Sequence, residues 1–107
     1  MIVSNLEVPY YAVIFTSVLK DIEISSYYKT AKRMEEIAKE QQGFLGIDSS
    51  RTDIGITISY WKTLNDIINW KNNLEHKEAQ IKGREEWYSK YQIRICKVER
   101  EYGFEDL

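Results

Sequence analysis

Residues 55–76 read GITISYWKTLNDIINWKNNLEH, and this stretch decides the fold. Its first seven residues are rich in β-branched and aromatic side chains, which is typical of a β-strand. Thr63 and Asp66 follow with the spacing of a capping box, in which side chains satisfy free backbone N–H groups at the start of a helix. The stretch therefore predicts a strand that ends at Trp61 and turns directly into a helix.

The helix after Trp61 is predicted to break near its middle. Asn72 and Asn73 are poor helix formers, so a second helical piece is expected over residues 75–86. The first piece is expected to turn its apolar side chains inward: Leu64, Ile67, Ile68, Trp70 and Leu74. The second piece places five residues on one face by their helical spacing: His76, Ala79, Gln80, Gly83 and Trp87.

A strand and a helix are predicted upstream of this stretch. Residues 10–17 are apolar on both faces, which is typical of a central strand. Serines at positions 25 and 26 are candidate caps for a helix that runs to about residue 41. Gly43 is placed to end that helix in the left-handed conformation.

Two more strands complete the pattern. Residues 44–51 are predicted to pair with residues 55–61 through a four-residue turn in which Gly55 is free to take a positive φ. Residues 88–102 alternate between apolar and polar side chains, but the phase changes near Cys96. Either a β-bulge near Cys96 or a strand that leaves one sheet to cover another would explain this change.

The predicted order is β-α-β-β-α-β, the ferredoxin-like arrangement of the α+β class with a four-stranded antiparallel sheet. A chain of 107 residues has the usual size of one domain, so a single domain over residues 1–107 is expected. Two helices cover only one face of such a sheet, whereas the strands are apolar on both faces. A second copy of the chain, packed sheet against sheet, is the simplest cover, so a homodimer is predicted.

Composition narrows the function classes. The formal net charge is -2 with both signs mixed along the chain, which argues against nucleic acid or an anionic membrane as a partner. The first residues lack the features of a secretory signal, and no apolar run approaches the ~20 residues of a membrane helix. The single cysteine, Cys96, excludes an internal disulfide and suits a reducing compartment, so a cytoplasmic protein is expected. Within a strand, Cys96 is expected to be a small buried hydrophobe.

The run ITISYWKTLNDIINWKNNLEHKEAQIKGREEWY, which follows GFLGIDSSR, resembles the antibiotic biosynthesis monooxygenase family of dimeric α+β barrels. The resemblance covers about residues 10–102. It is strongest in the Gly-Phe, Gly, Ser and Arg positions of GFLGIDSSR, in the Ser-Tyr-Trp strand end, and in the spacing of Trp, Asn, Glu-His, Ala-Gln, Gly and Trp that follows. These features specify the family well and the reaction poorly, because the fold hosts many activities.

The resemblance implies a pocket between the helices and the sheet of each subunit. Enzymes of this family oxygenate electron-rich phenols there without flavin or metal, because the substrate carbanion itself reacts with oxygen. Their pocket Trp matches Trp70, and the polar residue six positions later matches His76, although those enzymes can carry Tyr there. The resemblance therefore implies a small aromatic substrate and no cofactor.

Two departures from the family pattern concern neighbouring positions. The Asn that such enzymes place one helical turn before the Trp falls at Asp66, with Asn65 one position away. Related haem-degrading proteins ligate iron through a His about ten residues after the Trp, and this position is Gln80 here. Haem binding and degradation therefore rank third among the functions that the resemblance suggests.

The residues themselves leave structural alternatives open. His76 is the only histidine, and an imidazole pKa of about 6.5 suits a general base that takes a phenolic proton. Alternatively, His76 is a structural residue at a helix start, where its side chain bonds to the backbone or to a partner subunit. Trp70 is either a pocket wall or core filler. Arg51 could bind an anionic substrate group or form an ordinary ion pair. Tyr60 and Trp61 are expected to face opposite sides, so at most one lines the same cavity.

Two function classes follow. The first is a cofactor-independent monooxygenase in which Trp70 and His76 are catalytic, and its candidate substrate-binding residues are Arg51, Tyr60, Trp61, Asn65, Asp66 and Gln80. The second is a non-catalytic ligand-binding or housekeeping dimer in which the same residues only pack. An enclosed cavity reached by His76 favours the first, and a space filled by aromatic rings favours the second. With one His and one Cys, no transition-metal site within one subunit is expected.

Overall fold

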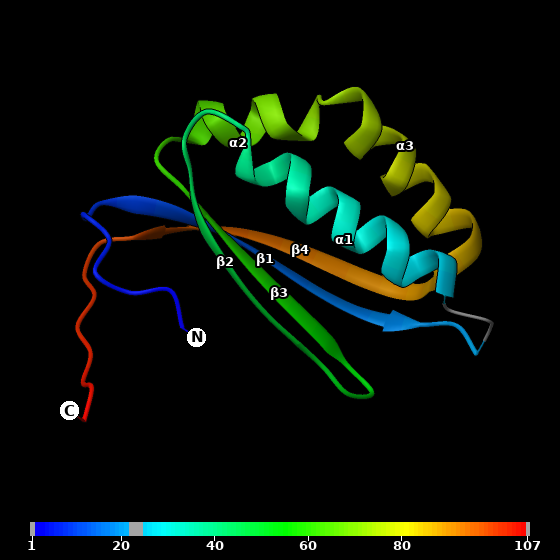
Figure 1. The fold of residues 1–107 in the computed structure, drawn as a ribbon, viewed down its shortest axis with the longest axis horizontal. Coiled ribbons are helices and arrows are strands. Elements are labelled where there is room, and N and C mark those ends of the chain that lie inside the picture. Colours follow the sequence, from blue (N-terminus) through cyan, green and yellow to red (C-terminus); the bar gives the residue numbers. More distant parts are fainter. Residues whose placement is uncertain (1, 22–24, 107) are drawn as a thin grey trace.

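The computed structural model describes residues 2–21 and 25–106, with all their side chains except that of Leu74. Four strands form one antiparallel sheet, and the helices lie together on one face of it (Figure 1). The expectation that Leu74 points inward lies outside the described side chains. In this part of the chain, no helix is long and apolar enough to cross a bilayer.

The elements follow one another in the predicted order. They are β1 (Tyr10–Leu19), α1 (Ser25–Lys39), β2 (Phe44–Arg51), β3 (Gly55–Trp61), α2 (Leu64–Lys71), α3 (Leu74–Lys82), the short π-helix η1 (Gly83–Trp87) and β4 (Tyr88–Val98). In the sheet the strands lie in the order β2-β3-β1-β4, and each neighbouring pair is antiparallel. The ferredoxin-like α+β fold predicted from the sequence is confirmed.

The register assigns the strand residues to the two faces of the sheet. Directly opposed residues of an antiparallel pair point the same way, so Tyr11 and its partner Trp61 share the helix-covered face. Trp61 is fully buried there. The alternate residues lie on the opposite face, which we call the open face; its apolar side chains include Ile14, Val18, Ile56 and Ile58. Within the described chain this face carries no helix, as Figure 1 shows.

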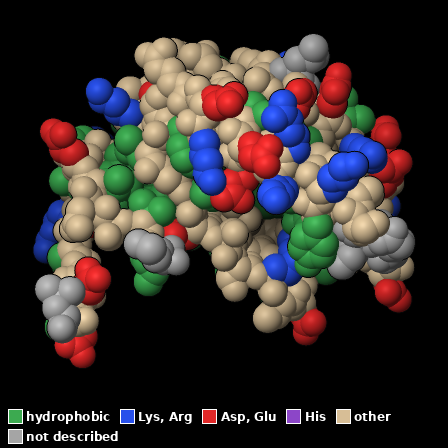
Figure 2. Space-filling model, viewed as in Figure 1, with side chains coloured by type: hydrophobic (Ala, Val, Ile, Leu, Met, Phe, Trp, Pro, Cys, Tyr) green, Lys and Arg blue, Asp and Glu red, His purple; other side chains and the backbone are tan. Residues whose placement is uncertain are grey.

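Charged side chains cover the helix side of the molecule. Figure 2 shows Lys and Arg interspersed with Asp and Glu over the helices, as the small net charge predicts. Several of these charges pair within or between helices, among them Lys39 with Glu35 and Lys82 with Glu86. Such exposed pairs contribute little to stability, so the fold depends on its buried aromatic residues instead.

The hairpin between β2 and β3 corrects one prediction. Arg51 pairs directly with Gly55, so Gly55 is a strand residue and the loop comprises only residues 52–54. Gly43 is the only described glycine with a positive φ, and the prediction of a positive φ at Gly55 is wrong. A Cβ at Gly55 would meet the guanidinium of Arg51 instead. Glycine is needed there because the Arg51 side chain folds across the strand.

The last strand corrects a second prediction. β4 pairs with β1 in one continuous register past Cys96, and the irregularity lies at the start of β4, where Ser89 is the extra residue between the partners of Val18 and Leu19. The predicted bulge near Cys96 is therefore wrong, because β4 is an edge strand whose side chains need not alternate strictly in burial. Cys96 is also exposed rather than buried, and it lies on the open face opposite Ala12.

The helix after β3 corrects a third prediction, which concerns its inward-facing residues. Of its predicted inward residues, Ile67 is buried, whereas Leu64 and Ile68 are 48% and 54% exposed. All three fit one apolar stripe, but α2 is only two turns long and meets the sheet along a narrow strip. Its outer apolar residues therefore remain at the surface.

Gly43 ends the connection after α1 in the predicted left-handed conformation, with φ at 82°. A Cβ there would also collide with the Asp66 carboxylate. Gly43→Ala is therefore expected to lower the free energy of unfolding by roughly 2–4 kcal/mol, from backbone strain and the clash together. Urea denaturation measures this loss. Lys77→Ala is the control because this side chain is exposed on the helix that follows Leu74; equal stability of the two variants would contradict the assignment.

Candidate functional site

The corner between β3 and α2 is closed by Thr63 and Asp66. The Thr63 hydroxyl oxygen accepts the Asp66 backbone N–H at 3.1 Å and donates its own proton to Asp66 Oδ2 at 2.8 Å. Asp66 is buried beside Gly43, where α1 leads into β2. The predicted capping pair thus forms, and it fixes the direction in which α2 leaves the sheet.

The predicted helix break brings Trp70 and His76 together. α2 ends at Lys71 with Asn72 as its C-cap, and the side-chain oxygen of Asn73 accepts the His76 backbone N–H at 3.1 Å, so Asn73 caps α3. On one continuous helix these two side chains would point ~120° apart. Across the break, their ring centroids lie 4.2 Å apart with the planes inclined by 38°. Asn73 is a site-positioning residue that was predicted only as a helix breaker, although an Asn three residues before His76 is a usual capping signal.

The hydrogen bonds of His76 define its tautomer. Its Nδ1 lies 3.1 Å from the Trp70 carbonyl oxygen, which can only accept, so Nδ1 carries the proton. Its Nε2 is therefore the acceptor, and the Gln80 amide donates to it across a long 3.4 Å. Burial lowers the pKa of His76 below its usual value, and the bond to Trp70 opposes this only in part. At neutral pH, His76 is an uncharged base with its lone pair on Nε2.

A row of aromatic rings backs this histidine. Phe44 packs edge-on against Trp61 at 5.4 Å, and Trp61 stacks on Trp70 at 6.1 Å. Trp61 also donates from Nε1 to the Ser59 hydroxyl at 2.9 Å, which fixes its indole ring. The row Trp61–Trp70–His76 then ends at Gln80, so four predicted site residues lie together. Asp66 holds the start of the helix that carries Trp70.

The other predicted site residues lie elsewhere. Arg51 is at the far end of its strand, where it donates to Ser17 and lies over the ring of Tyr27 at 5.6 Å. Tyr60 is on the open face and donates to Asp48 Oδ2 at 2.9 Å. Burial and Asp48 raise the pKa of Tyr60 to about 12. Asn65 is exposed on α2.

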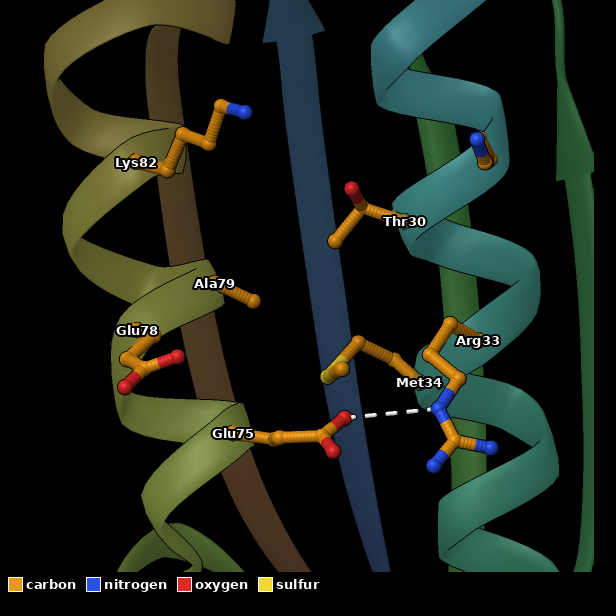
Figure 3. Close-up of a pocket in the computed structure, with 8 residues that line it drawn as sticks. Thr30, Arg33, Met34, Glu75, Glu78, Ala79 and Lys82 are labelled. Carbon is orange, nitrogen blue, oxygen red and sulfur yellow. Dashed lines mark ion pairs between the residues drawn. The ribbon is translucent and has the colours of Figure 1, made fainter.

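A groove of about 450 Å³ separates α1 from α3. It is lined by Lys29, Thr30, Arg33, Met34, Glu75, Glu78, Ala79 and Lys82, none of which is a predicted site residue. Figure 3 shows Met34 and Ala79 facing the space between the helices, while Glu75 reaches across to Arg33. The Arg33 Nε to Glu75 Oε2 distance of 3.4 Å makes this an ion pair that spans the groove. The groove therefore runs along the flank of α3, beside the face that carries His76.

Metal ligands do not gather in the described chain. Across residues 2–21 and 25–106, no three His, Cys, Asp or Glu side chains lie close enough together to hold a metal ion. The chemistry of the His76 row is that of a neutral base beside aromatic walls. Such an arrangement can take a proton from an aromatic hydroxyl group and hold the resulting ring by stacking.

Comparison with solved structures places this arrangement in a known class of fold. No family model matches the sequence. A candidate antibiotic biosynthesis monooxygenase from Nitrosomonas europaea superposes with a TM-score of 0.77 at 12% identity, over 94% of this chain and 100% of that one. One from Caulobacter crescentus CB15 gives 0.76 at 10% identity, over 86% and 92%. The protein thus has the fold of the antibiotic biosynthesis monooxygenases, as its sequence resemblance implied.

A curated relative identifies the family more narrowly. The chain is 44% identical over 102 residues to the uncharacterized protein YqjZ of Bacillus subtilis (strain 168). The match spans 94% of this chain and 89% of YqjZ. The chain belongs to the same family as YqjZ.

The lowered pKa of His76 predicts a pH dependence of stability. The unfolded chain takes up a proton on this histidine at about pH 6.5, whereas the folded chain does so only at lower pH. The stabilising contribution is therefore complete above pH 6.5 and is lost as the pH falls through the folded pKa. Urea denaturation between pH 5 and pH 8 should show a steeper acid decline for the wild type than for His76→Asn. Parallel profiles would contradict the buried neutral imidazole.

Proposed function

We propose that this protein is a homodimeric, cofactor-independent monooxygenase of the cytoplasm that oxidises a small electron-rich aromatic to a quinone. The observation that carries this proposal is the neutral imidazole of His76, held against the Trp70 ring with its basic nitrogen facing only a long contact from Gln80. The fold shared with named monooxygenases supports the same reaction class.

His76 acts as the general base in this reaction. Its Nε2 takes the proton of an aromatic hydroxyl group, and the electron-rich anion reacts with molecular oxygen at a ring carbon. Loss of water from the resulting hydroperoxide gives the quinone, so one phenol and one O₂ yield one quinone and one water. The substrate supplies all four electrons, O₂ is the oxidant, and one oxygen atom enters each product.

Gln80 and Trp70 would position the substrate. The 3.4 Å contact between Gln80 and His76 is at the limit of a hydrogen bond, so a phenolic hydroxyl group can replace it at small cost. The ring of the substrate would then continue the row of Trp61 and Trp70. Binding therefore requires Gln80 to turn away from His76, and the mixed polar and aromatic surroundings suit a small planar ligand.

The open face supports the proposed homodimer. Ile56 and Val18 are 43% and 37% exposed on it, and the exposed Cys96 lies on the same face farther along the sheet, opposite Ala12. A second copy packed on this face would remove these side chains from water, and obligate interfaces of this kind commonly bury about 2,000 Å² or more. An accessible free thiol is also compatible with a reducing compartment.

A second candidate function is a non-catalytic ligand-binding or housekeeping dimer. It is favoured by one observation: both ring nitrogens of His76 have partners, and its neighbours Trp61 and Trp70 stack in an unbroken row. In this case His76 joins α2 to α3, and the α1–α3 groove of about 450 Å³ is a space open to a ligand.

Oxygen uptake distinguishes the two functions. Purified protein, freed of flavin and treated with a chelator, is mixed with an anthrone or a dihydroxynaphthalene in an oxygen electrode. We expect uptake above the protein-free rate, with one quinone formed for each O₂ consumed. A folded dimer that gives no uptake above that rate with either compound class would contradict the monooxygenase and favour the second candidate.

A further inference from the structure

The segment after β4, residues 99–106, stands away from the rest of the molecule. Figure 1 shows it leaving the end of the sheet on the side opposite the helices. It contains two aromatic residues, Tyr102 and Phe104, which are 92% and 91% exposed. Large apolar side chains in this position gain nothing from the fold of their own chain, and exposed apolar surface of this kind is typical of an interaction site.

The start of this segment is nevertheless anchored. The Glu101 carboxylate lies near the Tyr10 hydroxyl group, and burial together with that carboxylate raises the pKa of Tyr10 to about 12. Tyr10 is itself buried and packs edge-on against Tyr60 at 5.8 Å. The anchor lies on the open-face side of the sheet, since Tyr10 and Tyr60 belong to the open-face residues of β1 and β3. The segment is therefore directed past the open face while its two aromatic residues remain almost fully exposed.

The length of the segment suits a second copy of the chain. Eight extended residues reach at most about 26–29 Å at 3.3–3.6 Å per residue. Two sheets packed face to face lie about 10 Å apart. A segment that starts at the rim of one sheet can therefore pass the interface and lie along the outer edge of a partner packed on the open face.

Charge also favours a copy of this chain as the partner. Residues 99–106 contain four acidic residues and one basic residue. The exposed edge strand β4 presents cations on the open face, namely Lys90 opposite Val18 and Arg94 opposite Ile14. An acidic segment and a basic strand edge in the same chain are complementary between two copies related by a two-fold axis, because each contact then occurs twice.

We propose that residues 99–106 form an arm that binds the partner subunit. Tyr102 and Phe104 pack on the surface of the partner, and the acidic residues of the arm lie beside the cationic β4 edge of the partner. This inference rests on the homodimer of the proposed function, and it adds a contact that packing of the open faces alone does not supply.

The arm is tested on the full chain with Tyr102→Ser/Phe104→Ser. Sedimentation equilibrium should show a dimer dissociation constant raised roughly 100-fold, about tenfold for each aromatic side chain that stays in water. Ile54→Ser/Ile81→Ser is the matched control, because these isoleucines are about half exposed but lie on the hairpin and on the outside of α3. Far-UV circular dichroism should be unchanged in both, since neither pair is buried.

Charge exchange provides an independent readout. Lys90→Glu/Arg94→Glu should weaken the dimer at low salt, and adding Glu105→Lys/Asp106→Lys should restore it. A wild-type dimer whose dissociation constant is the same in the Tyr102→Ser/Phe104→Ser variant would overturn the arm and leave the homodimer intact. A wild-type chain that sediments as a folded monomer at micromolar concentration would overturn both the homodimer and the arm.

Discussion

His76→Ala should lower the rate of aromatic oxygenation by about 10²–10⁴-fold, the usual contribution of a positioned general base. The imidazole is the one group in the row of Trp61, Trp70 and Gln80 that can take a proton at neutral pH. Its proton on Nδ1 is committed to the Trp70 carbonyl oxygen, so Nε2 is the only basic position. The wild-type rate should rise with pH through the lowered pKa of His76 and then level off.

Two matched variants separate catalysis from structure. His76→Asn keeps an amide that can donate to the Trp70 carbonyl oxygen but has no base, so it should lose as much rate as His76→Ala while retaining more stability. Lys77→Ala removes an exposed neighbour on the same helix and should leave the rate unchanged. Full turnover by a folded His76→Asn variant would remove His76 from the reaction.

Trp61→Ala should lower the free energy of unfolding by about 3–5 kcal/mol, the cost of removing a large buried aromatic side chain and leaving a cavity. Trp61 is fully buried and contacts Phe44 on one side and Trp70 on the other. Its loss should also let Trp70 shift, so the oxygenation rate should fall even where the variant is folded. Chemical denaturation, followed by circular dichroism because a fluorescent Trp is removed, measures the first effect.

Trp61→Phe is the appropriate control for this variant. Phenylalanine keeps an aromatic ring between Phe44 and Trp70 but loses the donor to Ser59, so its destabilisation should be clearly smaller than that of alanine. A loss below about 1 kcal/mol for Trp61→Ala would contradict the central place of this ring in the core.

The elements of the fold were predictable because their signals are local. The β-branched and aromatic residues of β3, the Thr63–Asp66 pair and the asparagines at the helix break each act within a few residues. The errors have a different origin. Gly55 is required by the side chain of Arg51 across the hairpin, and the exposure of Ile68 depends on how little of the sheet α2 covers. Neither the need for glycine at position 55 nor the exposure of Ile68 can be predicted from the spacing of apolar residues along the sequence.

The candidate site was predictable only in part. The family resemblance predicted that Trp70 and His76 are site residues. The helix break that brings them together was expected from Asn72 and Asn73. The tautomer of His76 was not predictable, because it depends on the helix break placing Nδ1 against the Trp70 carbonyl oxygen, which also accepts the Asn73 N–H at 3.0 Å. The separation of Tyr60 from Trp61 was expected from strand alternation, but which of the two faces the helices, and how far Arg51 lies from His76, is defined only by the sheet register.

The most direct measurement is turnover under ¹⁸O₂ by protein free of flavin and metal. The proposed reaction places one labelled oxygen atom in the quinone and the other in water, with one O₂ consumed for each quinone and no need for an added cofactor. A quinone that carries no label, hydrogen peroxide in place of water, or turnover that appears only after flavin or metal is added would contradict it.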